Sequence, residues 1–313
     1  MKTRLQTSTK KDPAITTSRQ CRGGVFLPVR KLPRTDPDAT VVVTENQWGK
    51  VTLKRCRLTQ THNNIRDAIL AYAELIRKAP DGRTAVLYSP GKILRKMKIR
   101  GKNHAWLYRK LEDMIGTLIE VETATFRGTG PMIQRIMESK VGMGGLLPKN
   151  ETDGEKTEPR FQLVIFDPFF SYLFNVDIGV HYKDLLPAIL DLRHAVNQAL
   201  VRFCLSHDEV NMALEEILIA LGAVRAEIPD RTKRQILKYV RDEAEAMRRD
   251  FGIGFRKMAD GREGIFYQKH PKVWFESPKP LPEPDLPKKE VGKPCATTNG
   301  KFIVPEPEFP ASL

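Results

Sequence analysis

The chain has 313 residues, of which 41% are hydrophobic, and its formal net charge is +14. That length suggests about two domains, and the strongly basic balance is typical of a nucleic-acid binder. The sequence lacks an apolar run long enough for a membrane span or a secretory signal. Its four cysteines are dispersed without a CxxC pair, so we expect neither disulfides nor structural zinc, and a cytoplasmic location.

Residues 1–40 are rich in Lys, Arg, Pro, Ser and Thr, which predicts a disordered basic tail. The first folded region begins near Val41, with strands predicted at Val41–Val43 and Val51–Leu58. Apolar residues at helical spacing then predict an amphipathic helix over Asn63–Lys78. A turn at 80–82 and a strand over Thr84–Leu87 follow.

Residues 88–123 predict a helix, a turn, a second helix and a strand. Ser89 is a good N-cap and Pro90 a good first helical residue. The second helix, over 103–115, has Leu107 at the centre of its apolar face, with Leu111 and Met114 on the same side. The helix-turn-helix followed by a strand is typical of a winged-helix domain, in which the second helix enters the DNA major groove.

Between Lys92 and Lys110 there are eight basic residues and no acidic one. An ordinary solvated helix with a basic outer face is the alternative interpretation. The candidate DNA-binding residues of this region are Lys92, Arg95, Lys96, Lys98, Arg100, Lys102, Asn103 and Arg109.

A long wing loop is predicted over 127–160, with a short helix possible over Pro131–Ser139. The strand Phe161–Phe166 would return from this loop and pair with Leu118–Thr123. These elements define a first winged-helix domain over 41–166, and residues 167–191 are predicted to form a connector.

The second half predicts three helices and a hairpin, which is again a winged helix, over 192–270. The first helix includes Leu192 and Phe203, and the second begins at a capping box of Ser206 and Glu209 and continues to Leu221. The third covers Arg231–Phe251, and the hairpin strands are 253–258 and 264–268. The Pro-rich residues 271–313 predict a disordered tail.

The helix from Arg231 gives the strongest functional signal, because it has five basic residues and no acid up to Arg241. A solvated helix more often mixes charges of both signs. The residues near its N-terminus are the better candidates for base contacts. The candidate DNA-binding residues here are Arg231, Thr232, Lys233, Arg234, Lys238 and Arg241.

The order of these elements resembles a plasmid replication initiator of the TrfA type. The similarity covers roughly residues 45 to 270, and the segments that carry it are AILAYAELIRK, YSPGKILRKM, WLYRKLEDMIGTLIEVE and RFQLVIFDPFF. The resemblance implies binding to direct repeats (iterons) at a plasmid origin, DNA opening, and recruitment of the host replicative helicase with DnaA. It also implies that the protein forms a homodimer in some states.

The overall prediction is an α+β fold, mainly helical, with two tandem winged-helix domains between disordered tails. The six histidines are dispersed and no catalytic constellation stands out, so we expect a non-enzymatic binder of double-stranded DNA without cofactor or metal. A winged-helix transcription repressor of plasmid or phage origin remains the alternative. An RNA-binding protein fits less well, because exposed aromatic residues for base stacking are few.

Overall fold

The computed structural model gives an α+β fold, as the sequence predicted. All described residues belong to one unit, Met1–Pro271, so the predicted Pro-rich tail lies outside them. The described residues are 16–17, 21, 25–29, 41–46, 49–55, 58–100, 103–122, 124, 127–139, 161–168, 179–180, 182–224 and 229–269.

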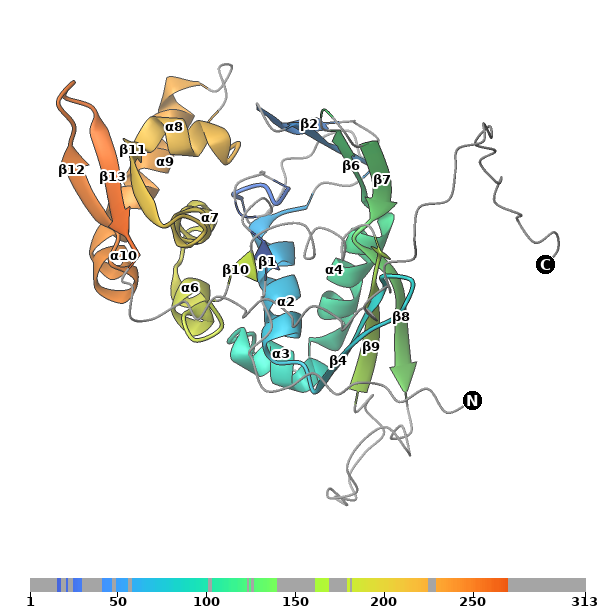
Figure 1. Cartoon of the computed structure of the whole chain (residues 1–313). Helices are drawn as coiled ribbons and strands as arrows, with labels where there is room; N and C mark the ends of the chain where they lie inside the picture. Colours follow the sequence, from blue (N-terminus) through green and yellow to red (C-terminus); the bar gives the residue numbers. More distant parts are fainter. Residues whose placement is uncertain are drawn as a thin grey trace, which may run out of the picture. The chain divides into compact units, whose positions relative to one another are not determined.

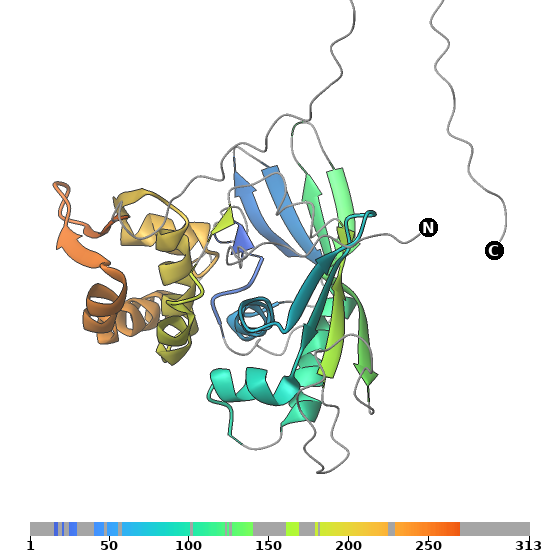
Figure 2. The same cartoon turned by 60° about the horizontal axis from the view of Figure 1, so that its bottom comes forward.

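The elements before residue 167 include three helices that pack beside an antiparallel sheet (Figures 1 and 2). The sheet order is β4-β5-β9-β8, with β5 paired to β9 in its centre. These elements are α2 (Gln60–Ala71), β4 (Leu75–Lys78), β5 (Thr84–Tyr88), α3 (Pro90–Lys96), α4 (His104–Gly116), β8 (Ile133–Ser139) and β9 (Phe161–Phe166).

A second four-stranded antiparallel sheet has the order β2-β3-β6-β7. Strand β7 is followed closely by β8, so the chain passes from one sheet to the other at Met132, which is fully buried. The strands of this sheet are β2 (Val41–Asn46), β3 (Gly49–Lys54), β6 (Leu118–Glu122) and β7 (Arg127–Pro131).

The predicted pairing of Leu118–Thr123 with Phe161–Phe166 is wrong. Strand β6 pairs instead with β3 and β7, and β9 pairs with β5 and β8. The possible helix over Pro131–Ser139 is also wrong, because most of that segment is β8. Its Ile133 and Ile136 are β-branched and suit a strand, and the 127–160 region is therefore partly sheet; residues 140–160 lie outside the described part.

The predicted helix over Asn63–Lys78 ends at Ala71 and is replaced by strand β4 at Leu75. The periodicity of this stretch favoured a helix, but β4 pairs with β5 across a turn in which Gly82 has a φ of +86°. That left-handed conformation suits glycine. The ladder to β5 satisfies the backbone groups of β4, so tertiary pairing decides the structure here.

The elements after residue 181 form a helical group with a three-stranded antiparallel sheet of order β11-β13-β12. Strand β11 lies between helices α7 and α8 and pairs with β13, the last strand of the hairpin, which is the winged-helix topology. These elements are α6 (Leu186–Asp191), α7 (Ala195–Leu205), β11 (Glu209–Ala213), α8 (Leu214–Ala220), α9 (Asp230–Asp242), α10 (Ala244–Phe251), β12 (Gly254–Lys257) and β13 (Glu263–Gln268).

The helix boundaries predicted in this half need three corrections. The helix from 192 to 203 is α7, preceded by the separate helix α6 inside the predicted connector. Ser206 is the C-cap of α7 and Glu209 begins β11, so the predicted capping box is wrong. The single helix predicted over Arg231–Phe251 is divided into α9 and α10 at Glu243. The predicted hairpin is confirmed as β12 and β13.

Part of the predicted N-terminal tail packs into the core. Strand β1 (Thr16–Thr17) pairs with β10 (Gly179–Val180), and Phe26 and Leu27 are buried. The Leu27 amide donates to the Leu58 carbonyl oxygen at 2.8 Å. The prediction of a disordered tail is therefore corrected for the described residues 16–17, 21 and 25–29. The proposed boundaries at 41–166, 167–191 and 192–270 stay a prediction.

Candidate nucleic-acid interface

Helix α4 presents the face that the sequence predicted. Leu107, Leu111 and Met114 are buried, while Ala105 and Arg109 are exposed. The buried stripe holds α4 against α2 and α3, and the opposite side remains accessible. Arg109 is therefore available to a ligand, although the acidic Glu112 is exposed one turn further along α4.

The basic residues around α3 differ in how freely they could reach a phosphate. Lys92 forms an ion pair with Glu74 at 2.7 Å, and the Lys96 ammonium lies over the Tyr72 ring at 5.1 Å from its centroid. Lys98 forms an ion pair with Asp191, the last residue of α6, at 2.5 Å. These three predicted residues thus already have intramolecular partners.

The turn between α3 and α4 is left-handed at Lys98, which has a φ of +55°. Sequence reasoning placed this turn at Gly101, which lies outside the described residues together with Lys102. Within the described part of the chain, Arg95, Arg100 and Arg109 are exposed and their side chains have no ion pair or hydrogen bond. Asn103 is the exposed N-cap residue of α4, without a side-chain cap bond.

Helix α9 ends where Glu243 turns its carboxylate toward the N-terminus of α7. That carboxylate accepts hydrogen bonds from the backbone amides of Arg193 (2.6 Å) and His194 (3.1 Å) and from Asn197 Nδ2 (2.7 Å). A negative charge is favourable there, because the first amides of a helix lack intrahelical partners. These contacts fix α9 against α7 and explain why the predicted long helix is divided.

The cations of α9 fall into two groups. Lys233 is ion-paired with Glu215 of α8, and Arg241 with Glu263 of β13 at 2.7 Å. Arg231, Arg234 and Lys238 are exposed, and no hydrogen bond or ion pair links their side chains to other described residues. Thr232 is also exposed. Of the six residues predicted on this helix, the three unpaired cations are therefore the best placed for an external anion.

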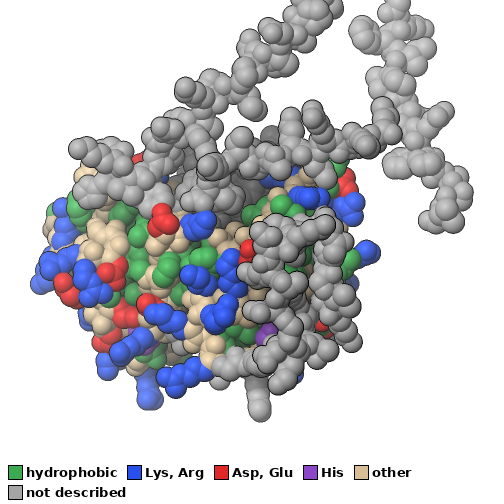
Figure 3. Space-filling model, turned by 90° about the horizontal axis from the view of Figure 1, so that it is seen from below, with side chains coloured by type: hydrophobic (Ala, Val, Ile, Leu, Met, Phe, Trp, Pro, Cys, Tyr) green, Lys and Arg blue, Asp and Glu red, His purple; other side chains and the backbone are tan. Residues whose placement is uncertain are grey.

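The β12–β13 hairpin brings further cations that sequence reasoning did not select. Lys257 is exposed, and Arg256 lies over the Phe266 ring at 5.1 Å and donates to Asn211 Oδ1 at 2.8 Å. Arg262 is paired with Asp260 and with Glu216. The basic residues on both sides of the predicted turn at 260–261 could have identified these cations from the sequence. On the coloured part of the face in Figure 3, Lys and Arg side chains are interspersed with acidic and hydrophobic ones.

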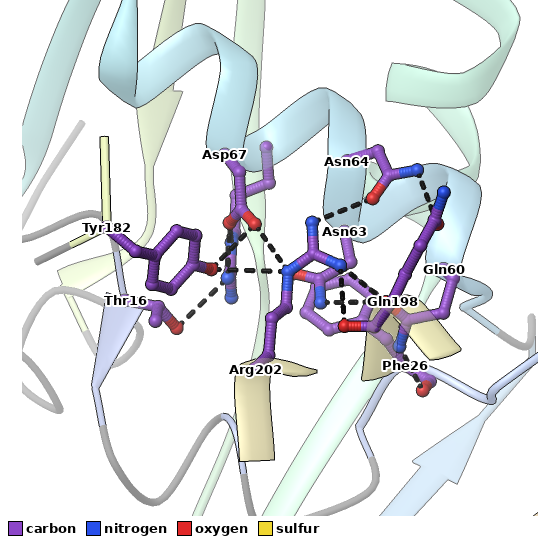
Figure 4. A network of polar contacts seen from close by, with 10 residues as sticks. Thr16, Phe26, Gln60, Asn63, Asn64, Asp67, Tyr182, Gln198 and Arg202 are labelled. Atoms are coloured by element: carbon purple, nitrogen blue, oxygen red, sulfur yellow. Dashed lines mark hydrogen bonds and ion pairs between the residues drawn. The ribbon is translucent and has the colours of Figure 1, made fainter. Parts of the chain in front are cut away.

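A buried polar network joins α2 to α7 (Figure 4). Asp67 Oδ2 accepts hydrogen bonds from Arg202 Nε at 2.8 Å and from the Tyr182 hydroxyl at 2.7 Å. Asp67 Oδ1 accepts from Arg66 Nη2 at 2.6 Å, and Arg66 also donates to Thr16 Oγ1 at 3.0 Å. Asp67, Arg66 and Arg202 are each 1% exposed or less.

The charges of this network stabilise one another. Burial opposes the charged form of Arg202, but the Asp67 carboxylate and the Tyr182 hydroxyl together outweigh it and raise the pKa of the guanidinium. Burial, together with the Asp67 charge, raises the pKa of the Tyr182 hydroxyl, which therefore stays a hydrogen-bond donor. Arg202 also donates to Asn64 Oδ1 and to Gln60 Oε1 on α2, at 2.7 and 3.2 Å. The network thus ties the two groups of elements together.

Within the described ranges, no three His, Cys, Asp or Glu side chains lie close enough to hold a metal ion. No described helix is long and apolar enough to cross a membrane. The two described cysteines, Cys21 and Cys204, are buried, and burial raises the pKa of the Cys21 thiol to about 12. Both thiols are thereby kept protonated and unreactive.

Comparison with known proteins gives a structural similarity alone. No protein-family model and no curated protein matches the sequence. A crystal structure of domains 2 and 3 of RctB has a TM-score of 0.53 and 12% sequence identity, and the match covers 80% of this chain and 97% of that one. A second crystal structure of the same RctB domains covers 80% and 95%, with 12% identity and a TM-score of 0.44. The chain shares the fold of RctB domains 2 and 3.

Proposed function

We propose that this protein is a replication initiator that binds duplex DNA and has no enzymatic activity of its own. The observation that carries the proposal is the outer face of α9, where Arg231, Arg234 and Lys238 are exposed and unpaired among the described residues. In a winged helix this is the helix that enters the major groove. A solved structure with the same fold comes from RctB, a replication initiator, which supports this role.

The proposed interface has a primary and a secondary part. The primary part is α9, whose exposed arginines can pair with guanine edges or phosphates. The secondary part consists of α4 with Arg109, the α3–α4 turn with Arg100, and the β12–β13 hairpin with Lys257. Contacts to phosphates by these secondary residues would position the protein on the duplex.

We further propose that the bound sites are direct repeats (iterons) at a replication origin, as the TrfA-type resemblance implies. Binding would help to open the DNA and bring in the host replicative helicase and DnaA, and a homodimer is part of this proposal. The order of the sequence segments supports this finer assignment. The protein would act by binding duplex, bent and melted DNA with different affinities, and it would not make or break covalent bonds.

A footprint of the purified full-length protein on DNA neighbouring its own gene tests the function. We expect protection of several direct repeats with a regular spacing. Protection of a single palindrome over a promoter would overturn the initiator proposal in favour of a repressor. An absence of protection, combined with tight binding to RNA, would overturn duplex DNA as the partner.

A further inference from the structure

The exposed face of α9 carries a long uncharged polar side chain among its cations. Gln235 is exposed, and it lies four residues after Arg231 and three before Lys238. Side chains three and four apart are neighbours on a helix surface. Val240, the buried residue of this helix, and the partly buried Ile236 and Leu237 anchor the other side. Gln235 therefore projects on the same side as the unpaired cations.

The side-chain amide of Gln235 forms no hydrogen bond with other described residues, neither with a side chain nor with the backbone. This distinguishes it from Gln60, Gln162 and Gln198, which are buried and hydrogen-bonded. It also distinguishes Gln235 from Lys233 and Arg241, whose cations are held by Glu215 and Glu263. Its donor and its acceptor are both available to a ligand.

The chemistry of the amide selects one base. Arg and Lys carry only donors and so pair with guanine acceptors or with phosphates, whereas a glutamine offers a donor and an acceptor together. Adenine presents the complementary pair, N7 and N6–H, on its major-groove edge. We propose that Gln235 is a specificity-determining residue that reads an adenine base in the major groove of duplex DNA. This inference rests on the proposed function.

The neighbours of Gln235 fit that role. Arg231 and Arg234 can supply phosphate or guanine contacts beside it, and these fix the register in which the amide meets a base. Duplex RNA is a poorer match, because its major groove is too narrow and deep for side chains to read. The proposal therefore commits to B-form DNA, with recognition at one A·T pair.

The test is a selection of preferred sites from a randomised duplex library by the full-length protein and its variants. Gln235→Met keeps the length of the side chain and removes the amide. We expect it to lose the preference for adenine at one position, keep the other preferences, and bind the wild-type site roughly five- to a hundred-fold more weakly. Gln235→Glu, which can only accept, should shift the preference at that position toward cytosine.

Two controls separate the inference from the proposed function. Gln134→Met makes the same change at another exposed glutamine, on β8 and outside the proposed interface, and should leave the selected site unchanged. Arg234→Ala should weaken binding and relax a different position. If wild-type protein selects a site and Gln235→Met selects the same one with equal affinity, or loses affinity equally on all sequences, the inference is overturned alone. If the wild type selects no sequence, the proposed function fails with it.

Discussion

His62 connects α2 to α4, a helix in the secondary part of the proposed DNA interface. Its Nδ1 accepts a hydrogen bond from the Thr59 amide at 2.9 Å, so Nε2 carries the proton and donates to Asp113 Oδ2 on α4 at 3.0 Å. Lys110 donates to the same carboxylate oxygen at 2.6 Å. Burial lowers the pKa of the imidazole, against the opposing influence of Asp113, so the ring is neutral in the fold.

The free energy of unfolding should therefore depend on pH through His62. In the unfolded chain the imidazole has its ordinary pKa near 6.5, above its value in the fold. The unfolded state then binds more protons in acid, and stability should decrease as the pH falls through about 6.5. Urea unfolding of the wild type and of His62→Gln between pH 7.5 and 5.5 measures this.

His62→Gln removes the titrating group, and we expect it to show a smaller loss of stability across that range. Its stability at pH 7.5 will be lower, because the contact between α2 and α4 is altered, so the comparison uses the slope with pH rather than the absolute value. Equal slopes in the two proteins would contradict a role for His62 in the pH dependence.

At the scale of elements, the sequence predicted correctly those features that depend on residues close together in the chain. The Ser89–Pro90 start of α3, the apolar stripe of α4 and the β12–β13 hairpin all follow from nearby residues, and the structure confirms them. Strands β4 and β11 were missed because their partners, β5 and β13, supply the ladder that a helix-like pattern cannot reveal. Tertiary pairing overrides propensity in such segments.

The predicted DNA-binding cations also depend partly on contacts between residues that are distant in sequence. The sequence identified the exposed cations on α9 but could not show which of them are already paired. Lys233 and Arg241 meet acids from α8 and β13, which lie elsewhere in the sequence. Lys98 meets Asp191 for the same reason. Availability to an external phosphate is a property of the folded surface.

Substitutions of paired and unpaired cations around α3 and α4 should therefore change the salt dependence of DNA binding by different amounts. Arg100 and Arg109 are unpaired among the described residues, so the double variant Arg100→Ala, Arg109→Ala should weaken DNA binding. Each lost phosphate contact reduces the slope of log affinity against log salt by about 0.9. Titration of one duplex at several salt concentrations gives the slope directly.

Lys92→Ala is the matched control, because the Lys92 ammonium is held by Glu74 at 2.7 Å. We expect it to change the salt slope by less than half as much as the double arginine variant does. A double arginine variant with the wild-type slope would remove α4 and the α3–α4 turn from the proposed interface.

At the scale of the whole molecule, the Asp67 network couples the two groups of elements. Replacing Asp67 with Asn would leave Arg66 and Arg202 buried without their counter-charge, and breaking a buried ion pair in this way costs about 3–5 kcal/mol of stability. We expect the wild type to unfold in a single transition, and Asp67→Asn to unfold earlier. Circular dichroism and tryptophan fluorescence, followed through denaturant titration, report the transitions.

The triple variant Arg66→Met, Asp67→Leu, Arg202→Met provides the comparison, because it removes the buried carboxylate together with both guanidinium groups and replaces them with apolar side chains. Its loss of stability should be smaller than that of Asp67→Asn. An Asp67→Asn protein as stable as the wild type would show that the buried carboxylate contributes little to holding α2 against α7.

The pairing of β1 with β10 also has a consequence for how the chain folds during synthesis. The segment around Thr16 leaves the ribosome well before its ladder partner Val180 and before Arg202, to which it is linked through Arg66 and Asp67. Domains generally fold from the N-terminus as they emerge, but this strand cannot form its ladder until Val180 has been made. Its docking would therefore be a late step, and a chain interrupted before Gly179 would lack the strand with which Thr16–Thr17 pairs.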